Sequence, residues 1–140
     1  MTPLGGWVSD RLVERYGPRA GRRLVAIFVL ALSAVLFGCG TSVSRPAAAA
    51  ALMSLALGFA SSSEGPFWAA AIDIGGAHVG AAGGILNTGG NLGGFLAPIV
   101  TPYIASHWGW PWGLYAGSFI MMLGVLVWLF VDPTKTVAPG

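Results

Sequence analysis

Four side chains in the apolar middle of this sequence have the chemistry of a solute-binding site. Glu64 is ionisable, Trp68 carries an indole N–H, and Asn87 and Asn91 carry amides that both donate and accept hydrogen bonds. Asn87 and Asn91 are four residues apart, so on a helix they share one face. An uncharged amide is costly in hydrocarbon without a partner, which points that face toward protein or an aqueous interior. We therefore expect these residues to line a cavity inside a membrane.

Each of these residues also has a purely structural interpretation. Glu64 could take up a proton, contact a solute, or pair with a polar group on another helix. Trp68 could stack on a ligand ring or pack against a neighbouring helix. The two asparagines could simply hold helices together through hydrogen bonds. The residues alone leave these alternatives open.

Signals of enzymatic chemistry are absent. The sequence contains no GxSxG nucleophile elbow, no HExxH zinc motif, no P-loop and no GxGxxG phosphate cradle. His78 and His107 fall at predicted helix ends, without a nearby pair of carboxylates. The single cysteine, Cys39, sits in an apolar run and cannot form an internal disulfide. We therefore expect no enzymatic activity, no metal and no cofactor.

The composition indicates what kind of element positions these residues. Of the 140 residues, 55% are hydrophobic and only 9% are charged, and the mean hydropathy is +0.74. Soluble domains carry about 25% charged residues. A membrane-spanning helix needs about 20 residues. The sequence therefore predicts an all-α integral membrane protein with about four transmembrane helices.

The apolar stretches and the turn residues set the predicted boundaries. Residues 1–8 read as the end of an earlier helix and residues 9–23 as a cytoplasmic loop. The second span is unusually long, and Pro66 predicts a kink in it because proline cannot donate a backbone hydrogen bond. His107 to Trp112 is expected to form an outer loop with a belt of tryptophans. The four predicted transmembrane helices cover residues 24–41, 47–74, 79–105 and 112–131.

Glycines dominate the third predicted span. Gly80 and Gly84, Gly89 and Gly93, and Gly90 and Gly94 have the small-xxx-small spacing of closely packed membrane helices, as do Gly113 and Gly117 in the last span. These pairs predict that neighbouring backbones approach closely.

Counting from the turn that joins the second and third spans places the polar residues at one depth. At about 1.5 Å per residue, Glu64 lies roughly 15 Å from Ile74, and Asn87 and Asn91 lie roughly 12 to 18 Å from Val79. Two antiparallel neighbours would therefore bring all three near the middle of the membrane. An ionisable residue at that depth, beside a broken helix, is typical of transporter sites.

The basic residues predict the orientation. Six of the seven, all except Arg45, fall on the side that we assign to the cytoplasm. We therefore expect a multi-pass protein of the cell inner (plasma) membrane with both ends in the cytoplasm. A nucleic-acid partner is not expected of so apolar a chain.

Two stretches resemble a known family. Gly6-Trp7-Val8-Ser9-Asp10-Arg11, followed by Gly17 and Gly21-Arg22-Arg23, resembles the G-x-x-x-D-R-x-G-R-R loop of the major facilitator superfamily, with an insertion before the last arginines. Residues 64–98 resemble helices ten and eleven of its anion:cation symporter branch, which includes hexuronate and galactonate carriers and sialin. The resemblance implies that the spans are helices nine to twelve of a twelve-helix carrier.

The resemblance also implies roles for particular residues. The loop, represented here by Gly6, Asp10, Arg11, Arg22 and Arg23, stabilises one state of a rocking cycle, in which Asp10 and Arg11 would pair with neighbouring helix ends. Substrate contacts in sugar-acid carriers of this branch would fall on Trp68 and Asn87.

Two functions therefore follow as expectations. The first is the C-terminal part of a carrier for a small organic anion and a proton, whose N-terminal helices are missing through a truncated gene product or a clipped gene model. No Arg or Lys lies inside a span, so the fragment alone should not transport. The alternative is a four-helix membrane protein that acts structurally, through helix–helix association.

Overall fold

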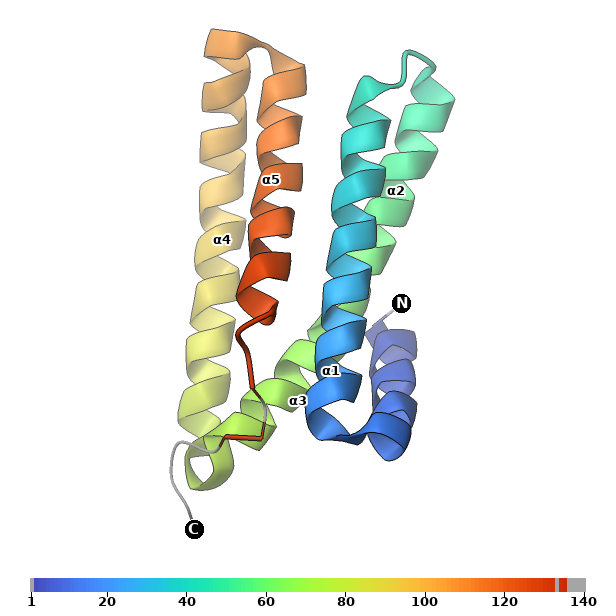
Figure 1. The fold of residues 1–140 in the computed structure, drawn as a ribbon. Coiled ribbons are helices and arrows are strands. Elements are labelled where there is room, and N and C mark those ends of the chain that lie inside the picture. The colour runs from blue at the N-terminus through green and yellow to red at the C-terminus, as the bar shows by residue number, and fades with distance from the viewer. Residues whose placement is uncertain (1, 133, 136–140) are drawn as a thin grey trace.

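The computed structural model describes residues 2–132 and 134–135, and for residues 2–6, 9, 18 and 19 it describes the backbone only. Met1, the first residue of the predicted helix end, lies outside this range. The described chain is helical throughout, which confirms the predicted all-α class (Figure 1). Its elements are α1 (Thr2–Ser42), α2 (Pro46–Ser62), α3 (Glu64–Gly75), the 3-10 turn η1 (Gly76–His78), α4 (Val79–Trp108) and α5 (Trp110–Trp128).

Three continuous helical stretches in the described residues are long and apolar enough to cross a membrane: Ala20–Ser42, Pro46–Trp108 and Trp110–Trp128. The second has 63 residues and contains α2, α3 and α4. It reverses direction after α3, so α2 and α4 are separate long helices (Figure 1). Four main helices result, as the sequence predicts.

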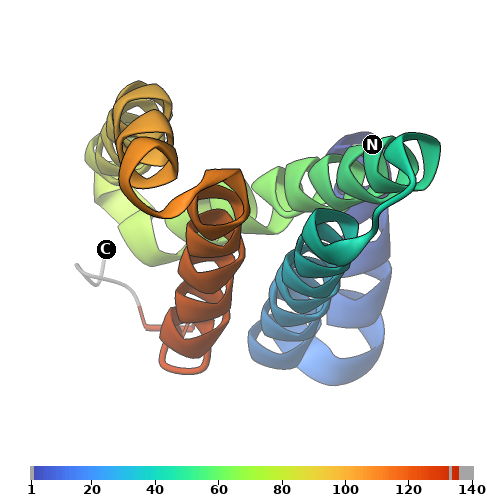
Figure 2. The ribbon, with the colours of Figure 1, turned by 90° about the horizontal axis from the view of Figure 1, so that it is seen from above.

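The helices form two hairpins that α3 joins. One hairpin pairs the second part of α1 with α2, and the other pairs α4 with α5 (Figures 1 and 2). The turn at residues 43–45 and the turn at Gly109 lie at one end of the molecule. The turn at Gly17 and the 3-10 turn η1 lie at the opposite end (Figure 1). Helix α3 crosses between the hairpins and positions the first half of the candidate site.

The predicted loop over residues 9–23 is helical. A single residue, Gly17, interrupts α1 with φ 83° and ψ 163°. Such a positive φ is easily reached only by glycine, so one residue suffices to reverse the chain. A Cβ on Gly21 would collide with the backbone nitrogen of Val13, so the two arms pack backbone against backbone. The charges of this segment therefore lie on a helical hairpin and not on a loop.

The predicted kink in the second span lies slightly upstream of Pro66. Helix α2 ends at Ser62, Ser63 forms the turn, and α3 begins at Glu64. The ring of a proline clashes with the carbonyl four residues earlier, which here belongs to Ser62. Pro66 is fully buried, and the interruption makes Glu64 the first residue of a new helix.

The predicted outer loop shrinks to one residue. Helix α4 stays continuous through Pro98 and Pro102 to Trp108, and α5 begins at Trp110. Gly109 alone connects them, with φ 94° and ψ 157°. The last helix accordingly covers residues 110–128, instead of the predicted 112–131.

The core forms where α1, α3 and α5 meet. It comprises Ala26, Leu30, Ala70, Val125 and Trp128. The ring of Phe67 stacks on Trp128 at 4.9 Å between centroids. Alanines on α1 and α3 let these helices approach the large indole closely. This cluster therefore anchors α3, and with it the candidate site, to the rest of the fold.

The Gly113–Gly117 pair offers a direct test of helix packing. A Cβ on Gly113 would lie 2.8 Å from the Thr101 carbonyl oxygen, whereas one on Gly117 would lie an ordinary 3.6 Å from Phe37. We expect Gly113→Ala to destabilise the protein by about 1–3 kcal/mol, because α4 and α5 must separate. Gly117→Ala, the matched control, should be neutral or slightly stabilising. Thermal unfolding in detergent measures both, and equal effects would contradict the α4–α5 packing.

Candidate solute-binding pocket

All four residues that the sequence singles out for solute binding line one pocket. The pocket lies between α3 and α4, has a volume of about 310 Å³ and is lined by Glu64, Phe67, Trp68, Leu86, Asn87, Gly90 and Asn91. Residues of the second and the third predicted span, which are distant in the sequence, thus meet in one pocket. Their functional roles stay predictions.

Helical spacing puts these side chains on facing surfaces. Glu64 and Trp68 are one turn apart on α3, and Asn87 and Asn91 are one turn apart on α4. The indole of Trp68 reaches across to α4, where a Cβ on Gly83 would lie 3.1 Å from its ring. A glycine at position 83 therefore lets the tryptophan lie close against α4 and form one wall of the pocket.

The polar groups of the pocket are largely free to bind a ligand. Asn91 donates from Nδ2 to the Asn87 carbonyl oxygen at 2.9 Å, which leaves the Asn91 amide oxygen as an acceptor. Glu64 and the Asn87 amide have no ion pair or side-chain hydrogen bond within the part of the chain that the structure describes. The pocket therefore offers one titratable carboxyl, amide donors and acceptors, and an aromatic wall. No arginine or lysine lines it.

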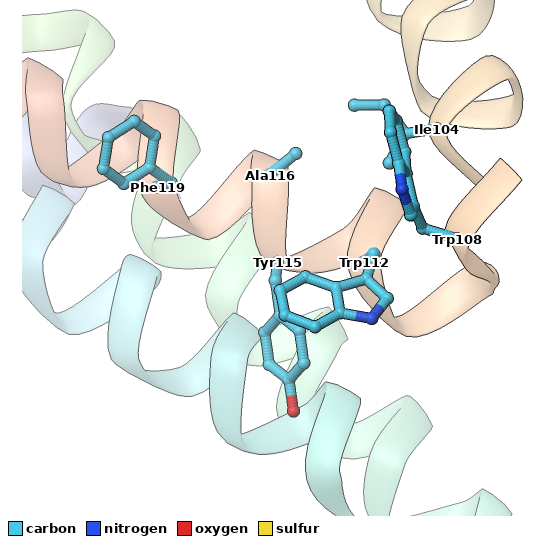
Figure 3. A pocket seen from close by; sticks show the side chains of 6 residues that line it. All are labelled: Ile104, Trp108, Trp112, Tyr115, Ala116 and Phe119. Atoms are coloured by element: carbon cyan, nitrogen blue, oxygen red, sulfur yellow. The ribbon is translucent and has the colours of Figure 1, made fainter.

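A larger pocket lies between α4 and α5, near the turn at Gly109 (Figure 3). Its volume is about 590 Å³, and its walls are Ile104, Trp108, Trp112, Tyr115, Ala116 and Phe119. The Tyr115 hydroxyl points away from it (Figure 3) and forms a 2.8 Å hydrogen bond with Ser42 on α1. This pocket has apolar walls without converging polar groups, so we favour the smaller one as the solute site.

Two of the three tryptophans predicted to form a belt, Trp108 and Trp112, line this larger pocket. Trp108, Trp110 and Trp112 are 63–65% exposed and stand at the same end of the molecule. The indole ring of tryptophan is apolar except for one N–H group, and it therefore suits the headgroup region of a bilayer. Their position agrees with a membrane boundary at the Gly109 turn.

The motif residues near the Gly17 turn join helix ends through charge. The Nε atom of Arg22 lies 2.5 Å from a carboxylate oxygen of Asp73 on α3. The Nη1 atom of Arg22 lies 3.6 Å from a carboxylate oxygen of Asp10. The Arg11 guanidinium lies 4.6 Å from the centre of the Trp7 ring, and Arg23 donates to the Leu129 carbonyl oxygen. Gly6 lies in α1, and the structure describes only its backbone.

Sequence reasoning missed Asp73 as a member of this cluster. Asp73 lies at the very end of the predicted span over residues 47–74, next to the turn into the third span. That assignment held a usable signal, because it put Asp73 at the same end of the membrane as Arg22. An acidic residue next to a block of arginines at a membrane boundary could have been paired with them.

Groups of three or more histidine, cysteine, aspartate or glutamate side chains that could hold a metal ion do not occur among the described residues. The structure thus adds no candidate metal site to the pocket between α3 and α4.

Comparison with known proteins places the chain in a family. It matches the profile of the Major Facilitator Superfamily over residues 1–140. A probable sulfoacetate transporter of Cupriavidus necator is 32% identical over 136 residues, covering 96% of this chain and 32% of that protein. The hexuronate transporter of Bacillus subtilis is 29% identical over 139 residues, covering 96% of this chain and 32% of that protein.

A third relative, the D-galactonate transporter of Escherichia coli, is 29% identical over 133 residues, covering 91% of this chain and 30% of that protein. The chain thus spans about a third of the length of the curated relatives it matches. No solved structure matches it.

These matches confirm the resemblance to the Major Facilitator Superfamily and to its anion:cation symporter branch. The superfamily consists of membrane transporters and not of enzymes, so the prediction of a non-enzymatic, multi-pass membrane protein is also confirmed. The relatives are carriers of the anion:cation symporter branch. The chain belongs to the Major Facilitator Superfamily.

Proposed function

We propose that this chain forms helices nine to twelve of a secondary carrier that moves a small organic anion together with a proton. The pocket shared by Glu64, Trp68, Asn87 and Asn91 is the observation that carries the proposal. The names of three relatives refer to sulfoacetate, hexuronate and galactonate, which are all small anions bearing a carboxylate. A sugar acid or a similar carboxylate is therefore the substrate class that we propose.

The chemistry of the pocket suits such a solute. The Asn87 and Asn91 amides can donate to carboxylate oxygens and accept from hydroxyl groups, as a sugar acid requires. The indole of Trp68 offers a flat apolar wall for the carbon skeleton. Glu64 can carry a proton while the solute is bound and lose it afterwards, which would couple the two movements.

The charge of the anion sets a limit on what the chain can do alone. Because no cationic side chain lines the pocket, the balancing positive charge must come from the N-terminal half of the carrier. Alternating access also requires two halves that rock about a shared site. We therefore propose that the missing N-terminal helices are obligatory partners.

The unpacked glycines of α4 support such a partner. Gly80, Gly84, Gly89, Gly90, Gly93 and Gly94 would each have no atom within 4 Å of an added Cβ, apart from their own helix and chain neighbours. Glycines repeated at this spacing are typical of closely packed membrane helices. The same glycines would serve the alternative function, a structural protein that associates through its helices.

For the orientation we propose that the Gly17 turn and both chain ends lie in the cytoplasm. Arg11, Arg15, Arg22 and Arg23 belong to the α1 segment around that turn, whereas Arg45 lies at the opposite end. The positive-inside rule then favours the cytoplasmic side for the Gly17 turn and an inner (plasma) membrane location.

Asn87→Ala tests the pocket directly. In a complete carrier containing this chain, we expect the half-saturating concentration of galactonate or sulfoacetate to rise roughly tenfold, because about 1.4 kcal/mol of hydrogen bonding is lost. The amount of protein in the membrane should not change. Ile85→Ala, on the opposite side of α4 and 76% exposed, is the matched control. Equal apparent affinity in both variants would reduce Asn87 to a packing residue.

A further inference from the structure

The seam between α1 and α5 holds two cavities that the solute-binding pocket does not use. At the Gly17 end of the molecule, a cavity of about 510 Å³ is lined by Tyr16, Ala20, Arg23, Leu24, Ile27 and Leu129. Farther along the same two helices, a second cavity of about 430 Å³ has walls that include Ala34, Val35, Phe119 and Met122. Neither cavity contains any residue of the pocket between α3 and α4.

The two cavities open on the same side of the seam. Ile27 and Ala34 are seven residues apart on α1, and Met122 of α5 is seven residues before Leu129, which caps the end of α5. Seven residues are two helical turns, so each pair lies on one face of its helix. The two cavities therefore lie in line along the membrane-spanning direction, as two sections of one groove with Arg23 at one end. We call it the α1–α5 groove.

Arg23 is the one cationic side chain in the walls of these cavities. One of its N–H groups donates to the Leu129 carbonyl oxygen, and no carboxylate among the described residues pairs with it. A guanidinium carries five N–H donors, so several remain for an anion. Tyr16, 64% exposed, stands beside it with an aromatic ring of the kind found at membrane interfaces.

The sides of the groove are suited to hydrocarbon. Leu24 in its wall is 53% exposed, and two further aromatic side chains on the same elements, Phe28 on α1 and Phe130 just after α5, are 65% and 87% exposed. Large apolar side chains at such exposure are stable only against lipid or another protein. A positive charge at a membrane boundary, followed by an apolar groove between two spans, is the arrangement that binds acidic phospholipids.

From this geometry we infer that the α1–α5 groove binds a phospholipid with an anionic headgroup. The phosphate lies against the Arg23 guanidinium, and an acyl chain lies along Leu24, Ile27 and Leu129. The inference rests on the proposed function in that α1 and α5 cross the membrane and that their groove faces lipid in the complete carrier. It is independent of the solute and of the proton.

Lipid retention by the full-length membrane protein tests this site. The protein is purified in detergent containing equal amounts of phosphatidylglycerol and phosphatidylcholine, and the bound lipid is measured by native mass spectrometry. We expect phosphatidylglycerol to be retained about fivefold more than phosphatidylcholine, since one basic residue is worth about 1 kcal/mol near a membrane surface. Arg23→Gln should abolish this preference, whereas Arg45→Gln, at the opposite end of the molecule, should preserve it.

Two further arms identify the occupant. Leu24→Trp, at an exposed wall position that leaves the core intact, should lower phosphatidylglycerol retention by blocking the acyl chain. Soluble glycerophosphoglycerol in excess should not displace the lipid, because it lacks that chain. An unchanged lipid preference in Arg23→Gln, retention of neither lipid, or full displacement by the soluble headgroup would each overturn the lipid site.

Discussion

Replacing Glu64 with glutamine is expected to abolish uptake driven by a proton gradient in a complete carrier, while exchange of labelled for unlabelled substrate continues. Glutamine has nearly the shape of a protonated glutamate and keeps its hydrogen-bonding capacity, but it cannot release a proton. A carrier with this change would remain in the proton-loaded form. Substrate could still enter and leave the pocket between α3 and α4, although a pH difference could no longer drive accumulation.

Two measurements on the same vesicles separate these outcomes. Uptake with an acidic outside should fall to the level seen without a gradient, and exchange at equal pH should stay close to that of the unaltered protein. Glu14→Gln is the matched control, because Glu14 is exposed on the helical hairpin around Gly17, away from the pocket. Proton-driven uptake at the original rate in the Glu64 variant would remove this carboxyl from the mechanism.

Breaking the Arg22–Asp73 pair is expected to have the second large effect. Asp73→Asn should destabilise the protein by about 1–3 kcal/mol, below the range for fully buried pairs, because the two side chains are 15% and 28% exposed. The pair joins α1 to the end of α3, so its loss should also loosen the helix that carries Glu64. A rocking carrier that uses this contact in one state should show an altered maximal rate of uptake.

Asp10 provides the control for this pair. Its carboxylate lies 3.6 Å from Arg22 and its side chain is 70% exposed. Asp10→Asn should therefore cost less than about 1 kcal/mol. The double change Arg22→Asp with Asp73→Arg should recover part of the stability lost in Asp73→Asn. Thermal unfolding of the purified protein measures all of these variants, and equal losses from Asp10→Asn and Asp73→Asn would contradict a specific role for Asp73.

Hydropathy and helical spacing were sufficient to predict that Glu64, Asn87 and Asn91 lie close together. The counting of residues from a shared turn put Glu64 at the depth of Asn87 and Asn91, and these residues do line one pocket. The prediction worked because a helix rises by a fixed amount per residue and because α3 and α4 are neighbours along the chain. Neither step required knowledge of more distant contacts.

The features that the sequence did not predict depend on contacts between distant segments. The many charges in residues 9–23 led to the prediction of a loop. Charges show only that a segment lies outside an apolar span, and they do not show whether that segment is helical. A single glycine at position 17 or 109 can reverse the chain, so the turns are shorter than composition suggests. The pairing of Arg22 with Asp73 depends on how α1 meets α3, and hydropathy carries no information about that.

Glycine spacing illustrates the same limit. The pattern predicted close approach at several pairs, and Gly113 does lie against the backbone of α4 at Thr101. Gly89 and Gly93 have the same spacing, but no neighbour of the described chain lies near them. Spacing identifies a surface suited to packing, whereas the partner must be found elsewhere.

The most direct test of this account is the accessibility of position 87 in a complete carrier. Asn87→Cys is introduced into a Cys39→Ser background, since Cys39 is exposed and would also react. A water-soluble, membrane-impermeant thiol reagent should label position 87, and galactonate or sulfoacetate should protect it. Ile85→Cys, on the other side of α4, should show no protection. Failure of the reagent to label position 87, or labelling that neither anion slows, would contradict a solute path between α3 and α4.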